Sequence, residues 1–223
     1  MERARASRRL GLVLAAAGLC AAGGLYFRYV VRDQIVARRF AEVEPGRVYR
    51  SGRLSPAQLQ AKVRQHGIRT IVDLGAFEPG SPEARTAERT ALALGVDRFV
   101  FGLRGDGTGE PQDYVEALRI ALDPARQPVL VHCAAGTHRT SVCVALIRAT
   151  DDPGPLRPDF ARDFEAFDYD RTDTPQTAAY LLQWGQKILD AYRSGGSLGP
   201  TTLDASGAGP KRPTDGAAPA LRP

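Results

Sequence analysis

The sequence predicts an α/β fold, a three-layer sandwich in which a short and largely parallel central sheet is flanked by helices. Two observations support this prediction. Short runs of β-branched and other apolar residues recur along the chain, and the segments between them begin with residues that favour a helix start. Strand, helix and strand in alternation form right-handed parallel units. The predicted strands are residues 48–50, 68–74, 97–101 and 128–132.

Three Ser-Pro or Glu-Pro pairs mark predicted helix starts. A serine at the N-cap accepts a backbone hydrogen bond, and proline fits the first turn because its missing N–H would have no partner there. Gly67 and Gly95 follow the first two helices, where a left-handed residue ends a helix. Trp184, on the last helix, is expected in the core. The predicted helices are residues 56–66, 82–94, 111–122, 140–147, 159–167 and 174–192.

Composition divides the chain into five segments. Residues 10–27 are almost unbroken apolar residues, and four arginines precede them. This pattern predicts a single-pass transmembrane anchor. The last segment is rich in Gly, Pro, Ala, Ser and Thr without periodicity, which predicts disorder. The segments are a basic tail (1–9), the anchor (10–31), a connector (32–44), a globular domain (45–193) and a disordered tail (194–223).

The anchor implies a membrane protein whose orientation stays open. The N-terminal arginines favour an inside N-terminus and an outside domain. Arginines also follow the anchor, and a reactive thiolate favours a reducing compartment.

The charge distribution argues against nucleic-acid binding. The net charge is +5, but much of the excess lies in the first forty residues, and no basic stripe with interleaved aromatic residues follows. The cysteines and histidines lack the spacing of a disulfide framework or a metal site. We expect no metal, no cofactor and a monomer. The residues concerned are Cys20, Cys133, Cys143, His66, His132 and His138.

The segment most informative for function is 128–140, PVLVHCAAGTHRT. An apolar strand, a short loop and a helix start form an anion site, because the loop N–H groups and the helix dipole both present positive potential. Cys133 at the head of this loop would be stabilised as the nucleophilic thiolate. Arg139 supplies a planar fork for two phosphate oxygens. The pattern predicts phosphoryl transfer through a cysteine; the alternative is that Cys133 is an inert core residue.

This segment resembles the H-C-x-x-G-x-x-R-[ST] signature of the cysteine-dependent protein tyrosine and dual-specificity phosphatases. Residues 48–52 (VYRSG) and 67–74 (GIRTIVDL) are similar to the opening of the atypical dual-specificity branch of bacteria, plants and fungi. The resemblance covers about residues 45–168 and implies that 45–193 is a phosphatase domain. Thr137 stands where plant and fungal members usually have Lys, and Ser141 where Gly is common. The first difference weakens the case for a highly phosphorylated inositol substrate.

The chemistry assigns a role to each residue of the loop. Cys133 is the expected nucleophile, and Arg139 with the loop amides stabilises the transferring phosphoryl group. Gly136 lets the backbone turn inward, and the Thr140 hydroxyl can donate to the departing thiolate. The resemblance implies that His132 supports the loop. The expected phosphate-binding residues are Ala134, Ala135, Gly136, Thr137, His138 and Arg139.

A general acid must protonate the leaving oxygen. The resemblance implies an Asp on a mobile loop before the helix that precedes the catalytic strand, and Asp106 in residues 105–110 (GDGTGE) fits. Asp113 and Glu110 are competitors, although the helix dipole alone favours acids at those positions. His138 is expected at the rim of the site.

The predicted substrates are phosphotyrosine, phosphoserine or phosphothreonine, or a non-protein phosphate ester. A rhodanese-like sulfurtransferase also uses a cysteine on an anion-binding loop, but such loops are shorter and persulfide chemistry leaves Thr140 unexplained. A non-catalytic phosphate-binding module is the second alternative, and the presence of both Cys133 and Arg139 counts against it.

Overall fold

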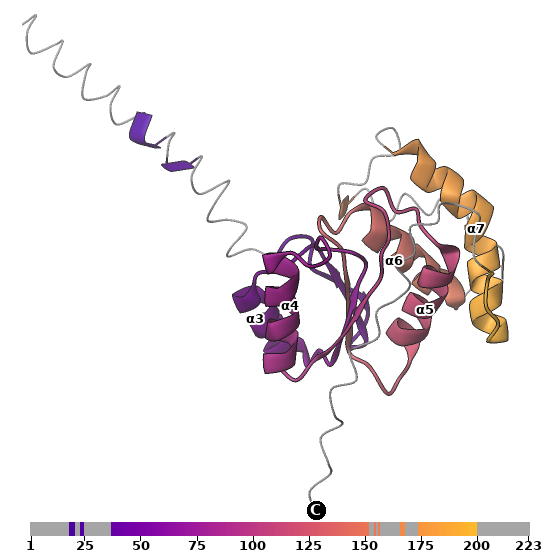
Figure 1. Ribbon diagram of the computed structural model, residues 1–223, viewed down its shortest axis with the longest axis horizontal. Helices are drawn as coiled ribbons and strands as arrows, with labels where there is room; N and C mark the ends of the chain where they lie inside the picture. The colour runs from indigo at the N-terminus through magenta and orange to yellow at the C-terminus, as the bar shows by residue number, and fades with distance from the viewer. Residues whose placement is uncertain are drawn as a thin grey trace, which may run out of the picture. The chain divides into compact units, whose positions relative to one another are not determined.

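A five-stranded sheet lies at the centre of the domain in the computed structural model (Figure 1). The chain divides into two units, Met1–Ala37 and Arg38–Pro223, and the sheet belongs to the second. The predicted α/β class is therefore confirmed. The structure describes residues 18–20, 23–24, 37–151, 154, 156, 166–167 and 174–199.

The strand order β1-β2-β5-β3-β4 places the strand that precedes Cys133 in the middle. Only β1 runs antiparallel, against β2; the other neighbouring pairs are parallel. In this register His132 lies between Ser51 of β2 and Asp73 of β3. The carboxyl ends of the three inner strands thus meet at one edge, where such folds place ligands. The strands are β1 (Ala41–Glu44), β2 (Val48–Ser51), β3 (Thr70–Asp73), β4 (Asp97–Val100) and β5 (Val129–His132).

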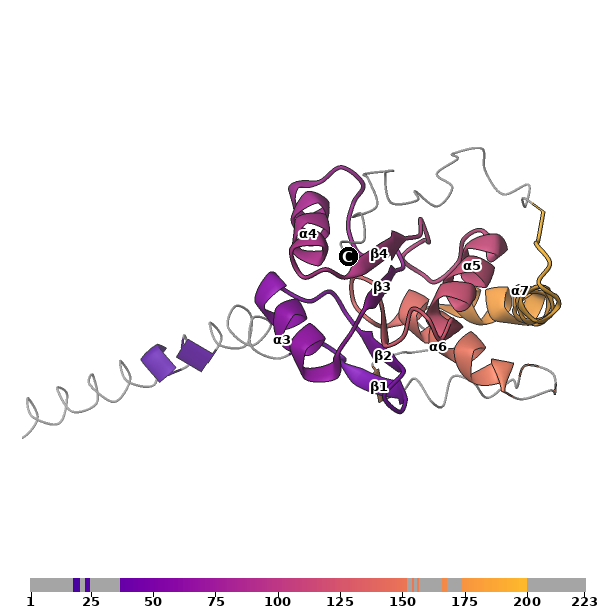
Figure 2. The same ribbon diagram turned by 90° about the horizontal axis from the view of Figure 1, so that it is seen from below.

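Helices cover both faces of the sheet. Figure 2 shows α3 and α4 on one side and α5, α6 and α7 on the other. The three layers predicted from the alternation of strands and helices are therefore present. The helices are α3 (Pro56–His66), α4 (Pro82–Ala93), α5 (Pro111–Leu122), α6 (His138–Thr150) and α7 (Pro175–Ser194).

Successive side chains of the inner strands enter opposite cores, as strand geometry requires. On β5, Val129 and Val131 pack with α5, α6 and α7. Leu130 between them packs with Tyr49 and Ile71 on the α3 and α4 side. Both faces of β5 are therefore buried, which explains its nearly continuous apolar sequence.

The local helix signals operate as predicted. Ser55 and Gln58 form a reciprocal capping box at the start of α3, and Gly67 ends that helix in the left-handed conformation. The Ser81 side chain caps α4. Glu110 precedes α5 but makes no side-chain cap bond. Trp184 packs against the larger core, as predicted.

Two structural details differ from the prediction. Residues 41–44, expected in a connector, form the edge strand β1, because their backbone pairs with β2 across a tight turn. The start of the expected disordered tail returns to α5: the Leu198 amide donates to Gln112 Oε1 at 2.7 Å, and the Leu198 side chain contacts the core. The predicted helix at 159–167 lies outside the described residues except for Ala166 and Phe167, and the basic tail at 1–9 lies wholly outside them.

The prediction of a membrane anchor at residues 10–31, and of a membrane location with it, is contradicted. In the part of the chain that the structure describes, no helix has the length and apolar content to cross a bilayer. Such a span requires about 20 consecutive apolar residues in one helix. Of the segment itself, residues 18–20 and 23–24 are described, as short helical pieces.

Candidate active site

Cys133 lies where β5 ends and a tight loop begins that leads into α6. Its side chain is buried, with 2% of its surface exposed. The Gly136 amide donates a hydrogen bond to the Cys133 sulfur over 3.2 Å. The loop therefore curls back over the sulfur and directs at least one N–H group toward it.

Gly136 in the loop and Gly52 after β2 lie against each other, and both positions need glycine. Gly136 has φ of +77°, and a Cβ there would lie 2.5 Å from the Gly52 nitrogen. A Cβ on Gly52 would in turn lie 2.7 Å from the Ala135 carbonyl oxygen. The loop thus packs directly on the backbone that follows β2, which a side chain at either position would prevent.

Three successive carbonyls of the loop accept hydrogen bonds from residues that flank or belong to β1 and β2. The Arg53 amide donates to the Ala134 oxygen at 3.0 Å. Arg39 Nη1 donates to the Ala135 oxygen at 2.7 Å, and Arg50 Nη2 donates to the Gly136 oxygen. These donors fix the orientation of three peptide planes in the predicted phosphate-binding loop.

Arg50 also belongs to the site, although the sequence predicted only that it lies on a strand. Its exposed fraction is 1%, and besides Gly136 it contacts Ser141 Oγ at 3.3 Å. Its guanidinium carbon lies 3.7 Å from the centre of the Phe167 ring. Burial lowers the pKa of Arg50 to about 10, which still leaves the side chain cationic at neutral pH.

Arg139, six positions after Cys133, occupies the first turn of α6. Its Nη1 donates to the carbonyls of Leu74, at 3.0 Å, and Gly75. A Cβ on Gly75 would lie 3.0 Å from the same nitrogen, and φ there is +77°, so the turn after β3 is shaped for the arginine. Arg139 Nε is buried without a partner among the described residues.

His132 lies between Ser51 and Asp73 in the sheet, next to the ion pair that Asp73 forms with Arg98. Asp73 is fully buried and accepts from Arg98 Nη2 at 2.5 Å and from the Ala76 amide at 2.6 Å. His132 Nε2 lies 3.7 Å from the same carboxylate. Burial lowers the pKa of His132, and Asp73 partly opposes that effect. The supporting role expected for His132 stays a prediction.

The hydroxyl of Thr140 is buried without a hydrogen-bond partner among the described residues. The expected bond from Thr140 to the Cys133 sulfur is therefore not formed in this structure. Cys143, three residues further along α6, is fully buried, and burial raises the pKa of its thiol to about 12. Cys143 belongs to the hydrophobic core.

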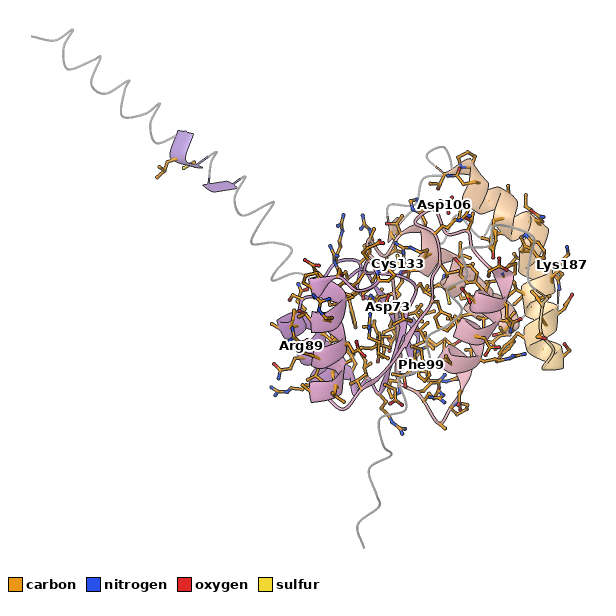
Figure 3. The ribbon with its side chains drawn as sticks, in the orientation of Figure 1. Asp73, Arg89, Phe99, Asp106, Cys133 and Lys187 are labelled. Atoms are coloured by element: carbon orange, nitrogen blue, oxygen red, sulfur yellow. The ribbon has the colours of Figure 1, made fainter. Side chains whose placement is uncertain are left out.

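The loop that contains Asp106 lies beside the start of α6. Gly107 is so close that a Cβ there would lie 3.4 Å from the backbone of His138. Figure 3 shows Asp106 and Cys133 toward the same end of the domain. Asp106 Oδ1 accepts from the Thr108 amide at 2.9 Å and from its hydroxyl at 2.7 Å. Among the described residues, Oδ2 of Asp106 makes no hydrogen bond.

Two hydroxyl groups hold this loop by its carbonyls. Tyr114 of α5 donates to the Gly107 oxygen at 2.7 Å. Thr177 of α7 donates to the Asp106 oxygen. The sequence reading missed both residues, because each is an ordinary helix residue until the helices are packed.

Asp113, the first competitor of Asp106, is turned into the protein on α5. Burial raises its pKa to about 6, with further contributions from Glu110 and Glu116. Burial, together with the charges of Asp113 and Glu110, raises the pKa of Tyr180 on α7. Glu110 is half-buried at the start of α5. Asp106 and Glu110 both lie in the connection between β4 and α5, and Gly107, next to Asp106, contacts the start of α6.

The structure thus gathers the predicted residues of the 132–140 segment around one loop, with Asp106 on the neighbouring loop. Arg39, Arg50, Gly75, Tyr114 and Thr177 join them from distant parts of the chain. No three His, Cys, Asp or Glu side chains within the described ranges lie close enough to hold a metal ion.

A parallel sheet with a buried cysteine at the head of a strand-to-helix loop, and an arginine six residues later, defines the class of cysteine-dependent phosphatases. Residues 34–152 match the model of the Tyrosine phosphatase family. The chain belongs to this family, and the match includes the whole loop and the arginines that contact it.

Two curated relatives illustrate the similarity. Inositol diphosphatase DSP1 of Oryza sativa subsp. japonica is 39% identical over 115 residues, which is 49% of this chain and 48% of the relative. Inositol diphosphatase DSP3 of Arabidopsis thaliana is 31% identical over 115 residues, covering 49% of this chain and 53% of the relative. The chain therefore spans about half the length of these relatives.

Solved structures share the fold at low identity. The catalytic domain of the PP-IP phosphatase SIW14 from S. cerevisiae, in complex with citrate, is 20% identical with a TM-score of 0.53, covering 71% of this chain and 88% of that one. The structure of P. aeruginosa TpbA is 19% identical with a TM-score of 0.52, covering 69% and 96%. These similarities confirm the predicted architecture.

Proposed function

We propose that this chain is a phosphatase that hydrolyses phosphate monoesters through a cysteinyl-phosphate intermediate on Cys133. The observation that supports this proposal most directly is the Gly136 amide, which donates to the Cys133 sulfur from a loop whose carbonyls are bonded on its other side. Such a loop stabilises a thiolate and then the oxygens of a phosphoryl group by the same N–H donors.

In the first step the Cys133 thiolate attacks phosphorus, and the bond from phosphorus to the ester oxygen breaks. Arg139 Nε, which has no partner among the described residues, and Nη2 bind two phosphoryl oxygens as a fork while Nη1 stays on the carbonyls of Leu74 and Gly75. Asp106 gives its proton to the departing oxygen.

In the second step a water molecule attacks the cysteinyl phosphate. Asp106, now a carboxylate, takes one proton from the water, and the bond from sulfur to phosphorus breaks to release inorganic phosphate. Thr140 Oγ1 is buried without a partner among the described residues and can rotate to donate to the departing thiolate. His132 supports the loop from the Asp73 side.

The substrate we propose is an aryl phosphate monoester such as phosphotyrosine. A cysteine-to-serine variant of TpbA was crystallised with phosphotyrosine. In this chain the loop positions between Cys133 and His138 hold only neutral residues, including Thr137 where plant and fungal members usually have Lys. A loop without an added cation suits a substrate that carries a single phosphate.

Inositol diphosphates are the second candidate substrate, because the curated relatives at 30% to 39% identity are named inositol diphosphatases. Phosphoserine, phosphothreonine and non-protein phosphate esters are further candidate substrates of the monoester class. The rival activity is sulfur transfer from thiosulfate, and the rival non-enzymatic role is phosphate binding alone.

A substrate panel on the full chain and on Cys133→Ser tests the proposal. We expect phosphate release from p-nitrophenyl phosphate and phosphotyrosine peptide, and a loss of at least about a thousandfold in Cys133→Ser, which lacks an accessible thiolate. Trapping of a ³²P-labelled intermediate in the parent should fail in the variant. Activity on thiosulfate without phosphate release would establish the sulfurtransferase instead, and substantial turnover by Cys133→Ser would exclude Cys133 as the nucleophile.

A further inference from the structure

Arg39 and Arg50 contact the outer side of the loop, the side away from the Cys133 sulfur. Each binds the carbonyl of one rigid peptide, and the N–H group of that same peptide lies on the inner side of the loop. In a trans peptide the carbonyl of one residue and the N–H of the next point in opposite directions. Arg39 Nη1 binds the Ala135 oxygen at 2.7 Å, and the N–H of that same peptide, on Gly136, donates to the Cys133 sulfur at 3.2 Å. An arginine almost a hundred positions away in sequence is therefore one peptide unit from the sulfur.

Arg50 stands in the same relation to the next peptide. Its Nη2 binds the Gly136 oxygen, so the N–H of Thr137 is directed to the opposite, inner side. Arg50 is held in place by Ser141 Oγ at 3.3 Å and by the Phe167 ring at 3.7 Å. Ser141 is a contact that the Gly common at this position in the family cannot make.

The backbone around Arg39 is strained in a way that serves this contact. Among the described non-glycine residues only Arg39 has positive φ, at 51°. The Gly52 amide fixes the turn by donating to the Arg38 carbonyl at 2.8 Å. Such conformations are costly and persist only where the surroundings impose them, which is common at functional sites.

We propose that Arg39 and Arg50 are positioning residues of the phosphate site: by binding the outer carbonyls of Ala135 and Gly136 they hold the Gly136 and Thr137 amides toward the substrate phosphate. Their positive charges also lie behind the loop, where they favour an anion in front of it. This inference rests on the proposed function.

The test uses the full chain in a Cys133→Ser background, so that binding is measured without turnover, with inorganic phosphate as the probe in calorimetry. We expect Arg39→Met and Arg50→Met each to weaken phosphate binding about tenfold, the weight of roughly one hydrogen bond from a charged donor. Arg39→Lys should retain part of the affinity, because an ammonium can still bind one carbonyl. In the parent with Cys133 intact, Arg39→Met should also change the rate of alkylation by iodoacetamide.

Arg47→Met is the matched control. Arg47 lies in the same hairpin but contacts Gln127 Oε1 at 2.9 Å and Glu44, not the loop. Its removal should leave phosphate binding unchanged. Thermal unfolding of every variant separates folding from positioning: an Arg39 or Arg50 variant with a lower Tm but unaltered phosphate affinity would overturn the inference. If the Cys133→Ser parent itself binds no phosphate, the proposed function fails with it.

Discussion

Charged side chains donate to the carbonyls of one loop of the site, and neutral hydroxyl groups donate to the carbonyls of the other. On the phosphate loop, the carbonyls of Ala135 and Gly136 are bound by the guanidinium groups of Arg39 and Arg50. On the neighbouring loop, the carbonyls of Asp106 and Gly107 are bound by the hydroxyls of Thr177 and Tyr114. In both cases the backbone is fixed by long-range contacts to carbonyl oxygens.

The difference follows from what each loop must do. A loop that receives a dianionic phosphoryl group benefits from positive charge behind it. A loop that delivers a proton must keep its carboxyl able to hold that proton, and a nearby cation would favour the ionised form. Neutral hydroxyls give the second loop the same rigidity without that cost. The predictions below test each side of this comparison.

The largest effect is expected for Arg139, the arginine that is proposed to bind the phosphoryl group. Arg139→Lys should lower kcat/KM about a hundred- to a thousandfold, because an ammonium cannot bind two phosphoryl oxygens while also binding the carbonyls of Leu74 and Gly75. Steady-state kinetics with p-nitrophenyl phosphate measures it. A rate near that of the parent would show that the fork is not used.

Asp106→Asn tests the loop that is held by hydroxyl groups, because it removes the carboxyl group that is proposed to be the general acid. Turnover should fall about a hundredfold for alkyl phosphates, whose leaving group needs a proton, and much less for activated aryl esters. The measurement is the dependence of kcat on the leaving group. An equal loss for good and poor leaving groups would point to a structural role for Asp106 and return attention to Asp113 and Glu110.

Removing the hydroxyls behind Asp106 should have a smaller effect of the same kind. Tyr114→Phe and Thr177→Val should each lower turnover about threefold to tenfold, the weight of one neutral hydrogen bond, and more for poor leaving groups than for good ones. Tyr180→Phe is the matched control, since the Tyr180 hydroxyl is buried without a partner among the described residues. A loss that is independent of the leaving group would mean that the two hydroxyls only stabilise the fold.

The smallest effect on turnover is expected for Asp113→Asn, which should stay within about twofold of the parent. Its effect is on stability. The pKa of Asp113 is raised by burial from 3.8 to about 6, so the folded state binds the proton more tightly and stability falls as pH rises between those values. The variant should therefore unfold at a higher temperature than the parent at pH 7.5, with the two converging near pH 4. A large loss of turnover would instead make Asp113 the better candidate for the acid.

The sequence by itself determined the elements and the centre of the site. Ser55, Ser81 and Gly67 act on backbone groups within a few residues, so their effect is visible in a short window. Cys133, Gly136 and Arg139 are equally local, since one strand end, one loop and one helix start bring them together. The apolar strands could be assigned because both of their faces are buried.

Only the tertiary structure decided which distant groups complete the site. Arg39 lies in a segment whose arginines looked like charges flanking an anchor, and Arg50 in one that looked like an ordinary strand. Arg50 reaches the loop because β2 pairs with β5 in a register that places Ser51 beside His132. Arg39 is held beside the end of β2 by the Gly52 amide, which donates to the Arg38 carbonyl. The hydroxyls of Tyr114 and Thr177 likewise meet their carbonyls only after α5 and α7 pack together. Hydrogen bonds from a side chain to a distant carbonyl depend on strand register and helix packing rather than on neighbouring residue types, so no local pattern announces them.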